Sequence, residues 1–264
     1  MNQTFVRHWI IEKAAAFVYF SLVKFLRLFD RADGGGNSLA GFLFDFLYDD
    51  YRIKGCRFEI PKKLTTRSFR SRFFYKGYES REVFLVEKFI QPGDNVLELG
   101  ACLGVISCLT NRKLSDPQKH VVVEANPHLI PWLAKNKAKN QCQFVIEHCL
   151  VSDTSDGEFF IHPLIVGGSA NRQTGQKVQV PVKTLKALEE AHGFTFSALI
   201  LDIEGGEHDF LVENAADLGH IKTIIVEFHD WIIGKEAIAI CTDLLSKNGF
   251  HCAFKQQCVE VWQR

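Results

Sequence analysis

Short apolar runs and longer amphipathic stretches alternate along the chain from residue 80 onward. The apolar runs have the length of buried strands and cover 95–100, 120–125, 143–152, 198–204 and 223–229. Between them, stretches with helical periodicity predict helices over 80–90, 104–114, 127–140, 184–193, 208–219 and 235–249. Two further runs, 158–163 and 177–183, suggest added strands, and 251–263 suggests a terminal hairpin. Strands that alternate with helices indicate an α/β fold with a mostly parallel seven-stranded sheet, covered on both faces and closed by an antiparallel hairpin.

The first 50 residues have a different pattern and predict an N-terminal aromatic helical segment. Residues 4–31 read as one long helix with a basic side and a face rich in Phe, Leu, Ile and Val, and residues 39–51 as a second helix. The charge-free run at 14–23 is about half as long as a bilayer span. We favour a helical cap that packs on the main domain. The alternative is peripheral membrane or partner contact through residues 1–31.

Residues 51–81 form a basic lead-in, because Lys and Arg there far outnumber Glu59 and Glu79. Alternating apolar positions predict a strand or two in this segment. The basic residues suit a solvated face or an anionic substrate. The α/β domain is then expected to occupy residues 82–264.

Overall composition excludes several classes of protein. The 264 residues are 47% hydrophobic, which argues against disorder, and their formal net charge is zero, which gives no sign of specific nucleic-acid binding. The eight cysteines form no C-x-x-C pair, so a zinc finger has no support. We read them as reduced thiols and expect a cytoplasmic protein.

A glycine turn follows the first predicted strand of the domain. Gly100 and Gly104 allow a tight turn into a helix, and Glu124 ends the next strand, where an acid can accept hydrogen bonds from a ribose. Glu98 precedes the turn and would repel a pyrophosphate. These features favour S-adenosylmethionine, which carries positive charge and a ribose but no phosphate. The plainer alternative is a Rossmann-like loop that only packs on its helix.

A second set of polar residues follows the strands at 198–204 and 223–229. Asp202, Glu204, Glu227 and His229 are expected at the carboxyl edge of the sheet, where ligands bind in such folds. His229 is the best-tuned general base near neutral pH, although it could be a structural histidine. Glu204 could instead hold the turn and Glu227 could be a capping acid. The four could also hold a divalent ion, but no tight ligand spacing singles out a metal, and we expect metal-independent chemistry.

Five stretches together resemble the FkbM family of class I S-adenosylmethionine-dependent methyltransferases. They are "YKGYESREV", "DNVLELGACLGVIS", "HVVVEANP", "VPVKTLKALEE…ALILDIEGGEHDFL" and "IIVEFH", and the resemblance runs from about residue 70 to the C-terminus. It implies a Rossmann-like fold in which the cofactor-binding residues are Glu79, Glu98, Gly100, Ala101, Cys102, Gly104, Glu124, Ala125, Asn126 and Asp202. It also implies that Asp202, Glu204 and His229 carry the catalysis.

Two positions depart from the family pattern. The family usually has Asp at the position of Glu98 and Asn at the position of Cys102. A thiol is a poor replacement for an amide donor, which leaves one cofactor contact open.

The function expected is O-methylation of a hydroxyl on a sugar, a glycolipid or another small hydroxylated acceptor. Two alternatives come from other classes. A nicotinamide oxidoreductase would need a third glycine and no acid at Glu98. A non-catalytic methyltransferase-fold protein would bind ligand or act as a scaffold through its aromatic N-terminus, and Cys102 is the feature that supports it.

Overall fold

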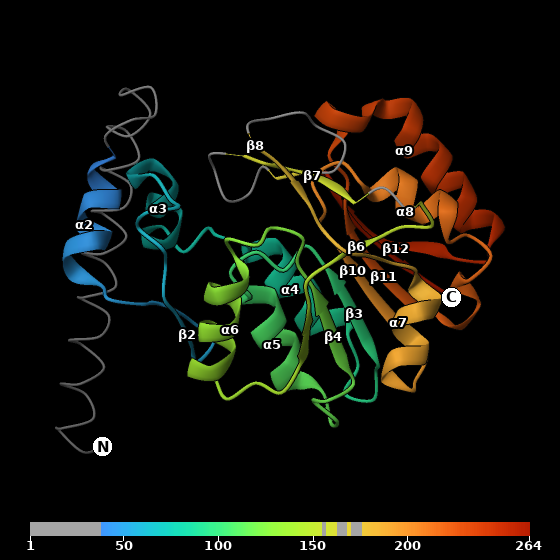
Figure 1. Cartoon of the computed structure of the whole chain (residues 1–264), viewed down its shortest axis with the longest axis horizontal. Helices are drawn as coiled ribbons and strands as arrows, with labels where there is room; N and C mark the ends of the chain where they lie inside the picture. The colour runs from blue at the N-terminus through green and yellow to red at the C-terminus, as the bar shows by residue number, and fades with distance from the viewer. Residues whose placement is uncertain (1–37, 155–156, 163–167, 170–175) are drawn as a thin grey trace, which may run out of the picture. The chain divides into compact units, whose positions relative to one another are not determined.

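The computed structural model describes residues 38–154, 157–162, 168–169 and 176–264 (Figure 1). The helix expected over 4–31, and with it any membrane contact, lies outside these residues. The described chain divides into two compact units: residues 38–51 with Thr65–Tyr78, here the helical unit, and Arg52–Leu64 with the described residues from Glu79 to Arg264, here the sheet unit. The segment 51–81, expected as a single lead-in, is therefore split between the two. No helix in the described part of the chain is both long and apolar enough to cross a membrane.

The helical unit contains α2 (Leu39–Leu47) and α3 (Arg67–Phe74). Each helix starts at a hydroxyl cap, since Ser38 accepts a hydrogen bond from the backbone N–H of Gly41 and Thr66 from that of Phe69, both at 3.1 Å. The expected helix over 39–51 thus ends early, whereas α3 is a helix that the sequence pattern did not specifically predict.

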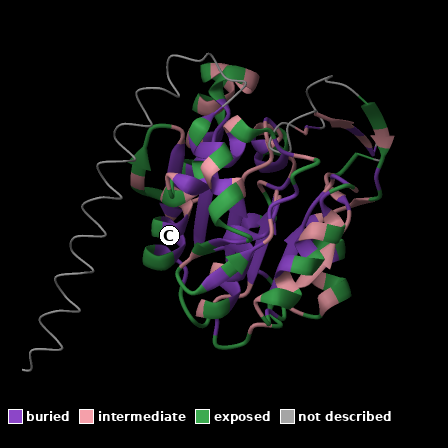
Figure 2. Cartoon of the chain, turned by 90° about the vertical axis from the view of Figure 1, so that its left-hand side faces the viewer, coloured by how far each residue is buried: buried purple, intermediate pink, exposed green. Residues whose placement is uncertain are grey.

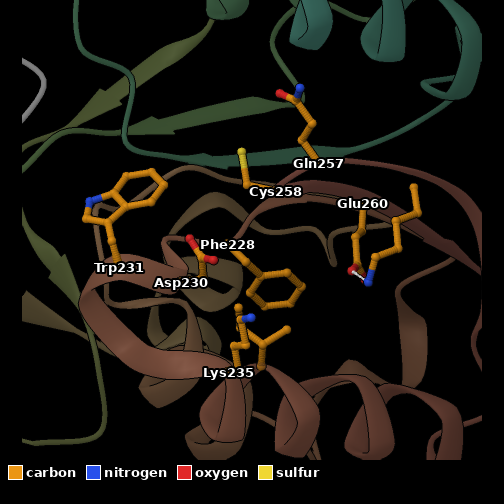
Figure 3. Close-up of a pocket in the computed structure, with 9 residues that line it drawn as sticks. Phe228, Asp230, Trp231, Lys235, Gln257, Cys258 and Glu260 are labelled. Carbon is orange, nitrogen blue, oxygen red and sulfur yellow. Dashed lines mark ion pairs between the residues drawn. The ribbon is translucent and has the colours of Figure 1, made fainter.

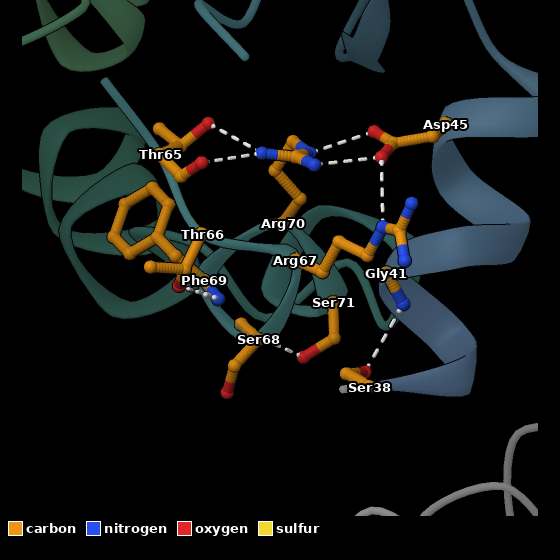
Figure 4. Close-up of polar contacts among 10 residues, drawn as sticks. All are labelled: Ser38, Gly41, Asp45, Thr65, Thr66, Arg67, Ser68, Phe69, Arg70 and Ser71. Atoms are coloured by element: carbon orange, nitrogen blue, oxygen red, sulfur yellow. Dashed lines mark hydrogen bonds and ion pairs between the residues drawn. The ribbon is translucent and has the colours of Figure 1, made fainter. Parts of the chain in front are cut away.

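A buried ion pair links the two helices of this unit (Figure 4). Arg70 is only 5% exposed, and its guanidinium donates to both carboxylate oxygens of Asp45, at 2.6 and 2.7 Å. It also donates to the hydroxyl of Thr65 at 3.0 Å. A Cβ on Gly41 would lie 1.9 Å from the carbonyl oxygen of Arg67, so the helices approach too closely for any side chain there.

The sheet unit is built on a seven-stranded sheet. In spatial order its strands are β12 (His251–Gln256), β13 (Val259–Gln263), β11 (Thr223–Glu227), β10 (Ala198–Leu201), β3 (Val96–Leu99), β4 (His120–Val123) and β5 (Val145–Glu147). Pairing is parallel from β11 to β5, whereas β13 runs antiparallel to β11 and β12. Counted along the chain from β3, the order is 3-2-1-4-5-7-6, read from the β5 edge. This confirms the predicted mostly parallel sheet with a C-terminal hairpin.

Helices cover both faces of this sheet, as the buried residues in Figure 2 show. One core joins alternate strand residues such as Leu97 and Leu199 to side chains of α7, α8 and α9, and the other joins Val96 and Ile200 to α4 and α5. The helices are α4 (Ser80–Phe89), α5 (Val105–Lys113), α6 (Ile130–Lys139), α7 (Leu185–His192), α8 (Glu207–Glu213) and α9 (Asp230–Lys247), with a 3-10 turn at Leu218–His220.

Three small sheets complete the described structure. They are β1 (Tyr51–Ile53) with β2 (Cys56–Phe58), β6 (Leu150–Val151) with β9 (Val182–Lys183), and β7 (Glu158–Ile161) with β8 (Gln176–Gln179). Two expected strands are each divided: 143–152 into β5 and β6, and 177–183 into β8 and β9. The second division falls at Pro181, which has no N–H for a ladder. The helix expected at 208–219 is α8 and ends earlier, at Glu213. The helix expected to begin at residue 235 is α9, which begins five residues earlier, at Asp230, and has a kink at Gly234.

Candidate functional site

The turn after β3 lies directly against the end of β10. Gly100 has φ +91°, and a Cβ there would be 1.7 Å from the carbonyl oxygen of Asp202. The N–H groups of Gly100 and Ala101 donate to the carbonyl of Val123, at 3.0 and 3.3 Å, which continues the pairing with β4. Gly104, at φ +79°, begins α5. The glycines therefore let two strand ends meet at one edge of the sheet.

Glu124, at the end of β4, is hydrogen-bonded to this turn through its side chain. Its buried carboxylate accepts the backbone N–H of Cys102 at 2.8 Å and that of Asn126 at 2.7 Å. Burial raises the pKa of Glu124 to about 7, although these backbone donors and that of Ala125 act to lower it. Each carboxylate oxygen can accept more than one hydrogen bond, so both remain able to receive ribose hydroxyls.

Cys102 contributes its backbone to this turn. Its N–H donates to Glu124, a contact that does not depend on the side chain at position 102. Asn126 is also structural in part, because its side-chain oxygen accepts the N–H of His128 at 3.0 Å. The carbonyl of Ala125 lies 3.2 Å from Nε2 of His148. These residues form a firm loop system around Glu124.

Glu98 lies on the other side of the strand from this loop system. Its side chain is buried in the layer between β3 and α5, where it accepts a hydrogen bond from the hydroxyl of Ser107 at 2.6 Å. Nε2 of His120 lies 3.2 Å from its second oxygen. Glu98 thus has partners within the core, and its expected part in cofactor binding stays a prediction.

Asp202, Glu204 and His229 converge where β10 and β11 end. Nε2 of His229 lies 3.6 Å from a carboxylate oxygen of Asp202 and 3.6 Å from one of Glu204. On the opposite side of the ring, Nδ1 lies 2.8 Å from Oε1 of Glu207, which also accepts the N–H of Gly205 at 3.0 Å. We call the three converging residues the acid–histidine cluster.

The electrostatics of this cluster bear on the role expected of His229. Burial acts to lower the pKa of His229, but the hydrogen bond to Glu207 and the charges of Glu207, Asp202 and Glu204 raise it to about 9. These three acids favour a positive charge at this position, whether it is carried by the imidazole or by a bound cation. The role of His229 as a general base stays a prediction.

The pKa of Asp202 is shifted upward, which makes its carboxylate a stronger base. Loss of bulk water raises the pKa of its carboxyl well above the usual range, although 36% of the side chain stays exposed. The neighbouring charges of Glu227, Glu204 and Glu79 raise the pKa of Asp202 further, and His229 lowers it. The expected residues Glu79 and Glu227 thus act on this site through their charge.

Strained backbone is found at three of the expected site residues. Glu79, Cys102 and Glu204 have φ values of 48°, 49° and 50°, in the left-handed region that residues other than glycine seldom adopt. Such strain persists where the surrounding structure enforces it and is frequent at functional sites.

A cavity of about 500 Å³ lies between the first half of α9 and the hairpin of β12 and β13 (Figure 3). Its lining includes Trp231, which is 62% exposed, and Gln257 and Cys258 from the turn between β12 and β13. The ring of Trp231 lies edge-on to that of His229, with centroids 4.9 Å apart. The thiol of Cys258 donates to Glu227 at 3.2 Å, which joins the cavity to the strand end.

The sequence reasoning missed this cavity and the acid Glu82. Burial and the charge of Glu227 raise the pKa of Glu82, which lies in the first turn of α4. Trp231 follows His229 closely, and that proximity was a usable signal. The turn at Gln257 carried none, because it reaches this edge only through the antiparallel pairing of Val259 with Glu227.

Comparisons with known proteins agree with this arrangement. The methyltransferase FkbM domain matches residues 98–252. Similar solved structures include a Streptococcus agalactiae protein of the NADB-Rossmann superfamily, 13% identical over 70% of this chain and 68% of that one, with a TM-score of 0.44. Another is an O-methyltransferase from Bacillus cereus in complex with SAH, 15% identical over 70% of this chain and 81% of that one, with a TM-score of 0.43. No curated protein matches the chain.

Proposed function

The chain belongs to the FkbM methyltransferase family, and on that premise we propose that it methylates a hydroxyl of a sugar, a glycolipid or another small hydroxylated acceptor, with S-adenosylmethionine as donor. One observation carries the proposal. The glycine turn and the acid–histidine cluster lie at the same sheet edge, with Gly100 against the backbone of Asp202. A donor held at the turn would thus be next to residues suited to an acceptor.

The residues around the turn fit the cofactor. Glu124 presents a carboxylate that is already fixed by Cys102 and Asn126, so ribose hydroxyls meet a rigid acceptor. The charges of Glu79, Glu204 and Glu227 gather around Asp202 and favour a cation. When bound, the cofactor supplies a methyl group on a positively charged sulfur.

The cavity between α9 and the hairpin suits the acceptor. Trp231 offers an exposed aromatic surface, and Asp230, Lys235 and Gln257 offer polar groups along the same lining. An apolar surface with a few convergent polar groups is typical of small-molecule sites and fits a sugar ring, which has both apolar and hydroxyl faces. An acceptor resting on Trp231 would lie next to the cluster.

The acceptor hydroxyl must lose its proton as its oxygen forms the new bond to carbon. Asp202 is the residue proposed to take that proton, since its raised pKa makes it a stronger base than an ordinary carboxylate. Glu204 and His229 would orient the hydroxyl. Holding the two reactants in line is the other contribution of the site, and in good cases it supplies about 7–11 kcal/mol.

The test is a titration followed by a transfer assay. The full chain should bind S-adenosylhomocysteine and not NAD in calorimetry, and should transfer a labelled methyl group to members of a panel of glycans, glycolipids and small hydroxylated compounds. Asp202→Asn should lower turnover by about 10²–10⁴, the usual share of a general base, whereas Asp217→Asn on the far 3-10 turn should not. Binding without transfer to any acceptor would support the non-catalytic alternative.

A further inference from the structure

The acid–histidine cluster has the composition and size of a binding site for a single metal ion. One donor atom from each of Asp202, Glu204 and His229 lies within 4.8 Å of the other two. Carboxylate oxygens are hard donors and an imidazole nitrogen is an intermediate one. Two carboxylates with one imidazole therefore suit a divalent cation such as Mn²⁺.

The orientation of His229 is the independent observation. The residue is 3% exposed, and Nδ1 lies 2.8 Å from the buried carboxylate of Glu207. A carboxylate accepts hydrogen bonds, so Nδ1 carries the proton and Nε2 is directed at the cluster. There Nε2 lies 3.6 Å from Asp202 and from Glu204, too far for a hydrogen bond to either. A buried imidazole nitrogen is thus aimed at the space between two carboxylates without a hydrogen-bond partner among the described residues.

These distances fit an ion at the centre. An ion about 2.0–2.2 Å from each donor holds neighbouring donors about 3.0–3.5 Å apart, close to the 3.6 Å on either side of Nε2. The contact between Glu207 and His229 is the carboxylate–histidine arrangement that fixes the ring of a metal-bound imidazole. We propose that Asp202, Glu204 and His229 bind one divalent metal ion, and that Glu207 orients the imidazole of His229 for this binding.

The proposal departs from the metal-independent chemistry expected from sequence. The role given to the ion rests on the proposed function, whereas the binding of the ion rests on the cluster alone. The ion would bind the acceptor oxygen and stabilise negative charge there as the hydroxyl proton leaves. Glu227, which is outside the ligand set, is then a second carboxylate that can take that proton.

Direct binding tests the proposal. The full chain, stripped with EDTA and returned to metal-free buffer, is titrated with MnCl₂ and free Mn²⁺ is followed by electron paramagnetic resonance. One ion should bind per chain, and Asp202→Asn, Glu204→Gln and His229→Gln should each weaken binding at least about tenfold. Glu207→Gln should weaken it by about 10–100-fold, as removal of an orienting partner does. Thermal unfolding identifies any variant that fails to fold. Mn²⁺ binding by the remaining ligand variants then decides whether the cluster holds the ion.

His208→Gln is the matched control. Nδ1 of His208 lies 2.9 Å from Asp209, so this is also a histidine–carboxylate pair, but it lies on the outer side of α8. Mn²⁺ binding should be unchanged in this variant. No saturable binding, or equal binding in the cluster variants, would overturn the metal site. S-adenosylhomocysteine binding and methyl transfer in EDTA are measured on the same samples, so that loss of the metal site and loss of the proposed function are told apart.

Discussion

The contact between the glycine turn and the end of β10 can be tested by Gly100→Ala. An added Cβ would lie 1.7 Å from the carbonyl oxygen of Asp202, well inside the 3.0 Å that real Cβ atoms keep. The obstacle is backbone, which cannot rotate away, so one of the two strand ends must move. The position also has φ +91°, which disfavours any residue with a Cβ.

Two other glycines separate these effects. Gly193→Ala places a Cβ at φ +73° with nothing within 4 Å, and Gly219→Ala adds one in open space without a positive φ. Left-handed backbone costs about 1–2 kcal/mol, and the lost freedom of the unfolded chain returns about 0.4–1 kcal/mol. We expect Gly219→Ala to be neutral or stabilising and Gly193→Ala to lose about 1 kcal/mol.

Gly100→Ala adds overpacking, which costs about 1–3 kcal/mol, for a total loss of about 2–4 kcal/mol. A domain with about 5–15 kcal/mol of stability still folds with that loss. Urea unfolding of the three variants measures the differences, and calorimetry with S-adenosylhomocysteine should show weaker binding for Gly100→Ala alone. A Gly100→Ala chain as stable as Gly193→Ala would refute the described contact between the strand ends.

Three further predictions concern charge and the acceptor. Because the pKa of Glu124 is raised to about 7, affinity for S-adenosylhomocysteine should rise with pH from 5.5 to 8 as the carboxylate forms, by up to about 30-fold, since pH 5.5 lies about 1.5 units below that pKa, and Glu124→Gln should abolish this rise in calorimetry. Asp45→Asn leaves buried Arg70 without its counter-charge and should lower unfolding free energy by about 3–5 kcal/mol, whereas Asp243→Asn in an exposed pair should cost less than about 1 kcal/mol; equal losses in urea unfolding would mean that the first pair is solvated. Trp231→Ala should raise KM for the acceptor at least about tenfold, with cofactor affinity unchanged, if the ring carries about 1.4 kcal/mol of acceptor binding.

The order of strands and helices in the sheet unit, the hairpin at its end, and the positions of Gly100 and Asp202 at strand ends could all be predicted from the sequence. These features follow from local periodicity, because each strand or helix must bury one face or both wherever it packs. The same local reasoning made no specific prediction at α3 (Arg67–Phe74), whose buried Arg70 pairs with distant Asp45. It failed at Pro181, where a single apolar run serves two different strands.

The chemistry open to the site residues depends on neighbours that come together only in the folded chain. Glu98 and Asp202 both end apolar runs, yet one is held in the core by Ser107 and the other stands at the open edge. His229 has its pKa raised to about 9 because Glu207, 22 positions earlier on another element, is brought against its ring. A residue's pKa, its orientation and its ability to bind an ion depend on neighbours that are far away in the chain. Hydrophobic periodicity specifies which residues are buried, but it does not specify which polar groups will face each other.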